Sequence, residues 1–311
     1  MSQARILPFS EAAIAEAAAL IAAGLPVAMP TETVYGLAAD ATSGDAVASI
    51  YAAKGRPSFN PLIVHVLDLA AASMLAELPP AAARLARAFW PGPLTIVARL
   101  KSNAPIAALA TAGLSTIALR APAHPAMRAL LAATGKPLAA PSANASGTIS
   151  PTRASHVLHS LGAAIPLIVD GGAADVGVES TIVALEADGL RVLRPGPVTN
   201  DQLIHASGLP ILSGTTDTIT APGQLAQHYA PSKPLRLCAT EARDGEWLIG
   251  FGEIAGDVTL SASGDTSEAA VRLFDLLHAA DAGDRPRLAV APIPERGLGV
   301  AINDRLRRAS A

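Results

Sequence analysis

The sequence predicts an α/β protein with a mixed, twisted sheet, followed by a second, smaller α/β unit. Short apolar runs alternate with helical patterns along most of the chain, as expected when helices cover a sheet. Between residues 208 and 234 the composition becomes polar and rich in Gly and Pro, as in an exposed connector. The length of 311 residues fits two domains, and 50% of the residues are hydrophobic, enough to fill their cores.

The elements of the first unit follow from this alternation. The runs typical of strands cover residues 27–29, 62–66, 94–98, 116–119, 167–169, 181–185 and 191–193. Helices are expected over 82–90 and 124–133, because proline or a polar residue opens each pattern. Near the N-terminus, Ser10 is a candidate helix N-cap, Glu11 suits a first helical turn and Gly24 ends the helix.

The alternation resumes after Pro234. Strands are expected over 235–238, 247–251, 258–261 and 288–291, and helices over 267–279 and 301–308. The sequence therefore predicts a first domain over residues 1–207, a connector over 208–233 and a small C-terminal domain over 234–311. No catalytic constellation is visible in the last of these segments.

Composition excludes several classes of protein. A net charge of −3 argues against a generally basic nucleic-acid binder, although a local basic cavity stays open. Cys238 is the single cysteine, so neither an intramolecular disulfide nor a multi-cysteine metal site can form. The apolar run 17–31 is too short to span a membrane, and the acidic Glu11 and Glu16 before it are unlike a signal peptide. We expect a cytoplasmic protein without a membrane segment.

Two cations one residue apart stand out in a chain with only 16% charged residues. Lys54 and Arg56 lie in a frame in which Gly55 permits a sharp bend, while Pro57 and Pro61 stiffen the chain. In an extended segment both side chains would point to one side, toward a phosphate or a carboxylate. The alternative is a pair of solvated loop cations, the more common situation for charged residues.

A second polar block, residues 142–147, places the hydroxyl of Ser142 and the amide of Asn144 at the same one-residue spacing. They could close a turn or cap a helix, and a helix beginning after them would itself attract phosphate. Neither common glycine-rich phosphate loop is present, so a bound nucleotide would be held by side chains and loops. Other polar candidates also have ordinary structural explanations. His65 could be a core histidine, and Arg120 and Arg194 could form ion pairs. The remaining candidates could be turn or strand-start residues: Thr33, Tyr35 and Ser180.

Five blocks, in matching order and with compatible spacing, resemble one known family. They are residues 31–37, 54–62, 90–95, 142–147 and 228–231. The chain is similar there to the YrdC-type domain of threonylcarbamoyl-AMP synthases, over roughly residues 10–200 and the last block. The resemblance implies a YrdC-like twisted mixed sheet with helices around a concave cavity. The length fits the long form of the family, which adds a small, Rossmann-like α/β domain.

The resemblance also implies a reaction. Such enzymes combine L-threonine, bicarbonate or carbon dioxide, and ATP into threonylcarbamoyl-AMP, and they release pyrophosphate. Mg²⁺ would sit on the phosphates, held by them and by water, so no protein metal site is expected. The product passes to a separate tRNA threonylcarbamoyl transferase complex, which modifies the adenosine beside the anticodon. Contact of the synthase with tRNA itself is compatible with this scheme but is not required by it.

The family's functional residues carry over onto matching positions. The residues implied for catalysis are Lys54, Arg56, Ser142 and Asn144. Those implied for ATP are Arg56, Asn60, Thr116, Ser142, Ser150, Arg194 and Tyr229. Those implied for threonine are Thr33, Tyr35, His65, Arg120, Ala140 and Ser180. His228 and Tyr229 resemble a lid, although residues 221–227 before them depart from the family's pattern. No general base is assigned, since His65 is chemically able but better suited to binding.

Two other functions stay open at this point. One is a noncatalytic RNA-binding module with a basic cavity, which the net charge and the lack of interleaved aromatic and basic residues disfavour. The other is a related carbamoyl or adenylyl transferase with another acceptor. Related domains of that type occur with zinc-finger and acylphosphatase regions, which this chain lacks.

Overall fold

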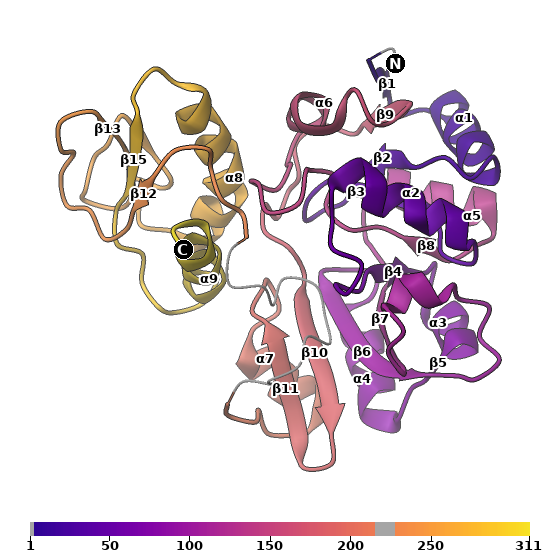
Figure 1. Ribbon diagram of the computed structural model, residues 1–311. Coiled ribbons are helices and arrows are strands. Elements are labelled where there is room, and N and C mark those ends of the chain that lie inside the picture. The colour runs from indigo at the N-terminus through magenta and orange to yellow at the C-terminus, as the bar shows by residue number, and fades with distance from the viewer. Residues whose placement is uncertain (1–2, 215–227) are drawn as a thin grey trace.

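The computed structural model describes residues 3–214 and 228–311, which we call the N-terminal and C-terminal regions (Figure 1). The N-terminal region is built on an eleven-stranded sheet. In spatial order its strands are β1 (Arg5–Pro8), β9 (Leu167–Asp170), β2 (Val27–Met29), β3 (Gly36–Asp40), β8 (Leu138–Ala139), β4 (Ile63–His65), β7 (Thr116–Arg120), β6 (Leu94–Leu100), β10 (Thr181–Glu186) and β11 (Gly189–Arg194), with β5 (Ala76–Glu77) paired to β6.

The large sheet is mixed, as predicted. β1 with β9, β9 with β2, β4 with β7 and β6 with β10 are parallel pairs, and the remaining neighbours are antiparallel. The helices of this region are α1 (Glu11–Ala22), α2 (Gly44–Lys54), α3 (Leu69–Leu75), α4 (Pro80–Phe89), η1 (Ala108–Thr111), α5 (Pro125–Thr134), α6 (Ala154–Leu161) and α7 (Asn200–Ser207). Ser10 caps α1 as predicted, because its hydroxyl accepts from the Ala13 amide at 3.2 Å.

The C-terminal region contains a four-stranded parallel sheet. Its strands, in spatial order, are β12 (Leu235–Arg236), β15 (Arg287–Val290), β13 (Glu246–Gly250) and β14 (Val258–Thr259), and its helices are α8 (Thr266–Ala282) and α9 (Gly299–Ala309). The two sheets fall on either side of the connector expected at 208–233. The boundaries given for the domains stay a prediction, and residues 215–227 of that connector lie outside the described residues.

Helices α8 and α9 of the C-terminal region face the N-terminal region (Figure 1). One hydrophobic cluster contains Val34 and Val178 of the N-terminal region together with Phe274 of α8. Gly177 permits this close approach, because a Cβ there would lie 2.2 Å from the carbonyl oxygen of Ala270. Its φ of +77° also falls in the left-handed region that favours glycine.

Two local expectations are wrong. Lys54 and Arg56 do not share an extended segment, because residues 44–54 form α2 and Gly55 ends that helix in a left-handed conformation with a φ of +59°. No helix begins directly after Asn144 either, since turns follow it and the next helix, α6, starts at Ala154. Among the residues that the structure describes, no helix has the length and apolar character needed to cross a membrane.

Candidate active site

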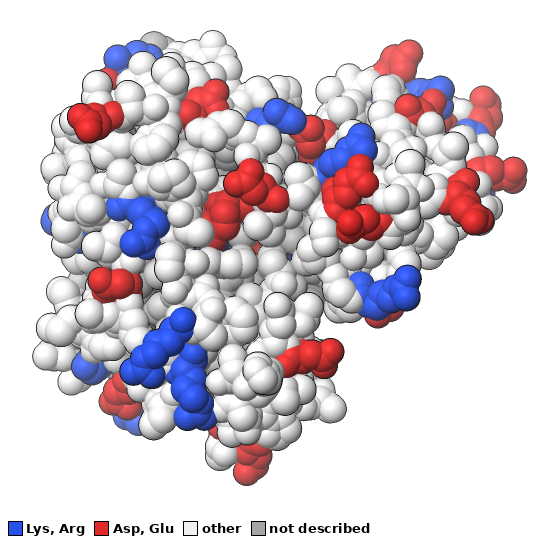
Figure 2. Space-filling model, turned by 180° about the vertical axis from the view of Figure 1, so that it is seen from behind, with Lys and Arg blue, Asp and Glu red and all other residues white. Residues whose placement is uncertain are grey.

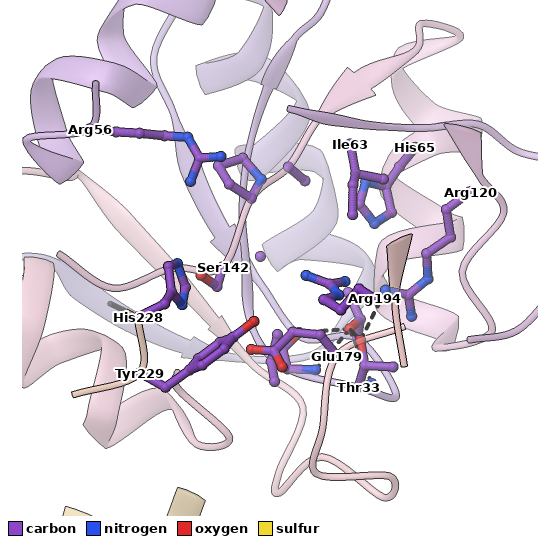
Figure 3. A pocket seen from close by; sticks show the side chains of 15 residues that line it. Thr33, Arg56, Ile63, His65, Arg120, Ser142, Glu179, Arg194, His228 and Tyr229 are labelled. Carbon is purple, nitrogen blue, oxygen red and sulfur yellow. Dashed lines mark hydrogen bonds between the residues drawn. The ribbon is translucent and has the colours of Figure 1, made fainter. Parts of the chain in front are cut away.

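A small cavity lies where ends of strands in the large sheet meet residues 228–229 (Figure 3). Its volume is about 40 Å³. The polar lining residues are Thr31, Thr33, Arg56, His65, Arg120, Ser142, Glu179, Arg194, His228 and Tyr229, and the others are Val34, Gly36, Ile63, Ala140 and Pro141. The structure thus brings together nine of the residues singled out in the sequence: Thr33, Arg56, His65, Arg120, Ala140, Ser142, Arg194, His228 and Tyr229.

The register of the sheet explains why distant residues meet here. Strands β4 and β7 run parallel, and His65 lies opposite Arg120 at their ends. Residues 140–142 follow β8 directly, and Ser142 forms an isolated bridge with Gly36 at the start of β3. A Cβ at Gly36 would lie 3.4 Å from the Ala140 side chain, in van der Waals contact, so the two segments pack closely at this corner.

Arg120 forms the centre of a hydrogen-bonded group at one end of the cavity. Its Nη2 donates to Glu32 Oε1 at 2.6 Å, and its Nη1 donates to Thr33 Oγ1 at 2.9 Å. Burial raises the pKa of the Glu32 carboxyl, but the charge and hydrogen bond of Arg120 outweigh this, so the pKa lies below its usual 4.5. Glu32 is therefore charged at neutral pH and holds the guanidinium in place.

Two further arginines reach the cavity without a carboxylate partner. Arg56 donates from Nε to the Asn60 carbonyl at 3.2 Å and from Nη2 to the Pro61 carbonyl at 3.0 Å. Arg194 donates to the backbone and side-chain oxygens of Ser180, at 3.1 Å each. Within the described residues neither forms a salt bridge, and burial lowers the pKa of Arg56 to about 10. Buried cations held only by neutral oxygens retain charge for an anionic ligand.

Lys54 does not line the cavity. Its buried Nζ donates to the carbonyl oxygen of Ser142 at 2.6 Å and also to that of Asn144. Burial, followed by the nearby charge of Arg56, brings the pKa of Lys54 well below its usual range. Through these hydrogen bonds Lys54 holds residues 142–144 in place, and Ser142 of this segment lines the cavity.

Several polar atoms at the site have no protein partner. Buried side-chain atoms without a hydrogen bond occur at six described residues: Asn60, His65, Asn144, His228, Tyr229 and Trp247. All but Trp247 are residues expected at the site from the sequence. Burial lowers the pKa of both His65 and His228 to about 3, so both imidazoles are neutral at pH 7. Because buried polar groups normally find partners, this concentration indicates a site that binds a polar ligand.

Other residues expected at the site lie behind the cavity wall or away from it. Ser180 holds Arg194, and the hydroxyl of Ser150 donates to Glu179 at 2.5 Å. The hydroxyl of Tyr35 donates to the Gly172 carbonyl at 2.7 Å, outside the cavity. Thr116 begins β7, four residues before Arg120, and it does not line the cavity either.

Sequence reasoning missed two carboxylates at the site: Glu179, which lines the cavity, and Glu32, which lies behind the lining and pairs with Arg120. Glu32 lies within the motif that starts at Thr31, where a charged residue between threonines in an apolar stretch was a usable signal. Glu179 directly precedes Ser180, but an acidic residue before a strand is common and indicates no function by itself. Both carboxylates neutralise arginines, a role that depends on partners far away in the sequence.

The Glu32–Arg120 pair predicts a pH-dependent loss of stability. Since the folded-state pKa of Glu32 lies below its unfolded value, the pair stabilises the fold above about pH 4.5, and this contribution is lost as the pH falls through the folded-state pKa. We expect Glu32→Gln to lower the free energy of unfolding at pH 7 by up to roughly 3–5 kcal/mol, because Arg120 loses its counter-charge. The free energy of unfolding of the variant should also fall less steeply toward acidic pH than that of the unaltered protein.

Thermal unfolding followed by circular dichroism from about pH 7 to about pH 3 measures both effects. Glu77→Gln is the matched control, because Glu77 makes only an exposed contact with Arg99 at 4.0 Å. Equal stability and an equal pH profile in Glu32→Gln and the unaltered protein would contradict the assignment.

Comparisons with known proteins place this site in a family. A family model described as "Telomere recombination" (Sua5/YciO/YrdC) matches residues 19–196, and one described as "Threonylcarbamoyl-AMP synthase, C-terminal domain" matches residues 198–311. The threonylcarbamoyl-AMP synthase of Bacillus subtilis is 40% identical, over 96% of this chain and 92% of the relative. That of Pyrococcus abyssi is 38% identical, over 94% and 93%.

A solved structure agrees with the sequence matches. The crystal structure of P. abyssi Sua5 complexed with L-threonine superposes with a TM-score of 0.89 and 36% identity, covering 100% of this chain and 97% of the other. The likeness thus extends over both the N-terminal and the C-terminal regions. With two matching family models and relatives that align along nearly its whole length, the chain belongs to the threonylcarbamoyl-AMP synthase family of nucleotidyl-transferring enzymes.

Proposed function

We propose that this protein makes threonylcarbamoyl-AMP and pyrophosphate from L-threonine, bicarbonate or carbon dioxide, and ATP. The observation that carries the proposal is the small cavity, in which buried arginines without carboxylate partners face polar atoms without hydrogen bonds. Three anionic groups must meet in this reaction: the carbamate, the triphosphate and the threonine carboxylate. A cavity with retained positive charge suits that task.

The threonine end is the side of the cavity with Thr33, His65 and Arg120, which lie together in Figure 3. Arg120 would hold the substrate carboxylate, since a guanidinium binds carboxylates through two parallel hydrogen bonds. The unpaired Nδ1 of His65 would bind the hydroxyl, and the apolar Ile63 and Ala140 would receive the methyl group. The L-threonine in the P. abyssi Sua5 structure supports this choice of substrate.

The nucleotide end is the side with Arg56, Ser142 and His228 (Figure 3). There the carbamate oxygen attacks the α-phosphorus of ATP and pyrophosphate leaves, while Arg56 and Arg194 stabilise the charge on the phosphoryl oxygens. Mg²⁺, if bound with ATP, would be held mainly by phosphates and water and would neutralise part of the triphosphate charge. We further propose that the product passes to a separate complex that modifies tRNA.

A direct assay tests the proposal. Pure protein incubated with ATP, Mg²⁺, bicarbonate and threonine should yield a threonylcarbamoyl adenylate that mass spectrometry detects. Serine is the matched control substrate, because it lacks only the methyl group. We expect kcat/KM for serine to be lower by about 10- to 200-fold, the range that one methyl group in an apolar niche provides. No adenylate would refute the function, and equal use of both amino acids would refute the assigned threonine end.

Arg56→Ala tests the nucleotide end. Loss of one charge-assisted contact to a phosphate should lower turnover on the order of 10²–10³-fold, by analogy with the removal of one oxyanion donor. Steady-state kinetics and thermal unfolding should be measured together, with Arg99→Ala as the control because Arg99 is largely exposed. If turnover stays near normal, or if the loss merely follows unfolding, Arg56 does not have this role.

We propose that His228 and Tyr229 act as a lid; residues 215–227 before them lie outside the described residues. The cavity volume of about 40 Å³ is far below the roughly 300–1,000 Å³ of common ligand pockets, so we expect His228 and Tyr229 to move when ATP binds. The Tyr229 ring is buried and reaches into the cavity, and its φ of +64° is left-handed. Closure over the substrates would keep water from the labile adenylate.

Tyr229→Ala should therefore release or hydrolyse the adenylate at least several-fold faster, because water reaches it more easily. Single-turnover experiments that follow free and enzyme-bound adenylate measure this. Tyr229→Phe is the matched control, since it keeps the ring and removes only the hydroxyl. Unchanged retention in Tyr229→Ala would leave the segment as a simple connection.

The RNA-binding alternative gains no support from the face of the molecule drawn in Figure 2. The face drawn in Figure 2 carries intermixed acidic and basic side chains among many uncharged ones, and no broad basic area covers it. A binding assay with a salt titration would show a steep salt dependence if RNA were the principal ligand.

A further inference from the structure

Arg305 of α9 is the most deeply buried charged residue among those described, at 0% exposure. It lies on the inner face of its helix with Ala301, Ile302 and Leu306, positions otherwise filled by apolar residues. A cation at such a position costs desolvation energy that a surface arginine avoids. The side chain therefore needs partners. One is the neighbouring Asp304, at 3.0 Å, and others lie in the N-terminal region.

The partners in the N-terminal region surround the cavity. Arg305 Nε donates to Glu179 Oε2 at 3.0 Å, and Nη1 donates to the Pro195 carbonyl at 2.6 Å, one residue beyond Arg194. Its guanidinium carbon lies 5.5 Å from the ring centroid of Tyr229, within the range of a cation–π contact. One side chain of the C-terminal region thus contacts a cavity carboxylate, the backbone beside a cavity arginine and the ring of the proposed lid.

The charge of Glu179 explains why Arg305 is needed at this place. It lines the same cavity as Arg56 and Arg194, where the proposed function places the phosphates of ATP. An uncompensated carboxylate there would repel the nucleotide. The ion pair with Arg305 neutralises that carboxylate, and the hydrogen bond from Ser150 helps to orient it.

We propose that Arg305 is a positioning residue of the active site, through which the C-terminal region completes the nucleotide-binding cavity. It holds Glu179 and the Tyr229 ring in place, and it cancels the carboxylate charge so that the positive charge of Arg56 and Arg194 remains available to ATP. This role rests on the proposed function, because it assumes that ATP binds in this cavity.

The test measures ATP binding by calorimetry, with turnover as a second readout. Arg305→Met should weaken ATP binding on the order of 10- to 100-fold, because the negative charge of Glu179 is left uncompensated near the triphosphate. The double variant Arg305→Met with Glu179→Gln should recover most of that loss, since it removes the repelling charge without restoring the contact. A purely structural role for Arg305 would give no such recovery.

Two control variants distinguish loss of the charge compensation at Glu179 from weaker packing between the two regions. Arg153→Met removes another arginine–carboxylate pair between the regions, that with Asp275 at 2.7 Å, which is half exposed and outside the cavity. It should leave ATP affinity unchanged. Gly177→Ala disturbs the approach of α8 without touching the pair, so Glu179→Gln should not rescue it. Thermal unfolding identifies any variant that fails to fold. Arg305→Lys keeps the positive charge and loses only the planar guanidinium, so it should bind ATP much better than Arg305→Met; equal losses in the two variants would contradict the charge argument.

The outcomes distinguish this inference from the proposed function. If the unaltered protein binds no ATP, the proposed function itself fails. If it binds ATP and Arg305→Met binds equally well, or if the double variant is no better than Arg305→Met, the positioning role is overturned. If Arg153→Met loses as much ATP affinity as Arg305→Met, the positioning role is also overturned, because weaker packing between the two regions would then explain both losses.

Discussion

The desolvation cost of buried positive charge governs the arrangement of this protein. Arg56 and Arg194 could have been neutralised by acidic neighbours, but they are held by the carbonyl oxygens of Asn60, Pro61 and Ser180. Neutral oxygens stabilise a guanidinium without cancelling its field. Acidic partners occur where a cation needs orientation, as at Arg120 and Arg305. The cavity thus keeps positive charge inside a chain whose net charge is −3.

The mixed sheet supplies those oxygens. Parallel pairing sets His65 beside Arg120, whereas the antiparallel hairpin of β10 and β11 returns the chain so that Arg194 lies beside Ser180. The backbone of the segment after β8 is fixed from behind by Lys54. Backbone carbonyls at strand ends have no further partners within the sheet, so they are free to accept from the arginines. The positions of the charges are therefore a property of the topology.

Much of the fold was predictable because its signals are local. Apolar runs give β2 with its observed ends, and proline marks the starts of α4 and α5. The helix α2 was not predicted, because Gly44 and several small residues give it little amphipathic pattern. Lys54 was therefore expected in an extended segment. At the site, motif residues were predictable, whereas Glu179 and Arg305 depend on a pairing across 126 residues of sequence. The sequence contained one signal for Arg305, a cation on the apolar face of a helix.

The left-handed backbone of Tyr229 has a consequence for the timing of a catalytic cycle. A non-glycine residue at a φ of +64° stores strain on the order of 1–3 kcal/mol. The closed state therefore lasts only while its contacts, such as the Ala230 amide bond to the Gly147 carbonyl at 2.8 Å, outweigh that strain. If Tyr229 belongs to a lid, as proposed, opening would relieve this strain, and the strain would therefore lower the free-energy cost of opening. The residue proposed to close the cavity would then also favour its reopening, which would help the product to leave.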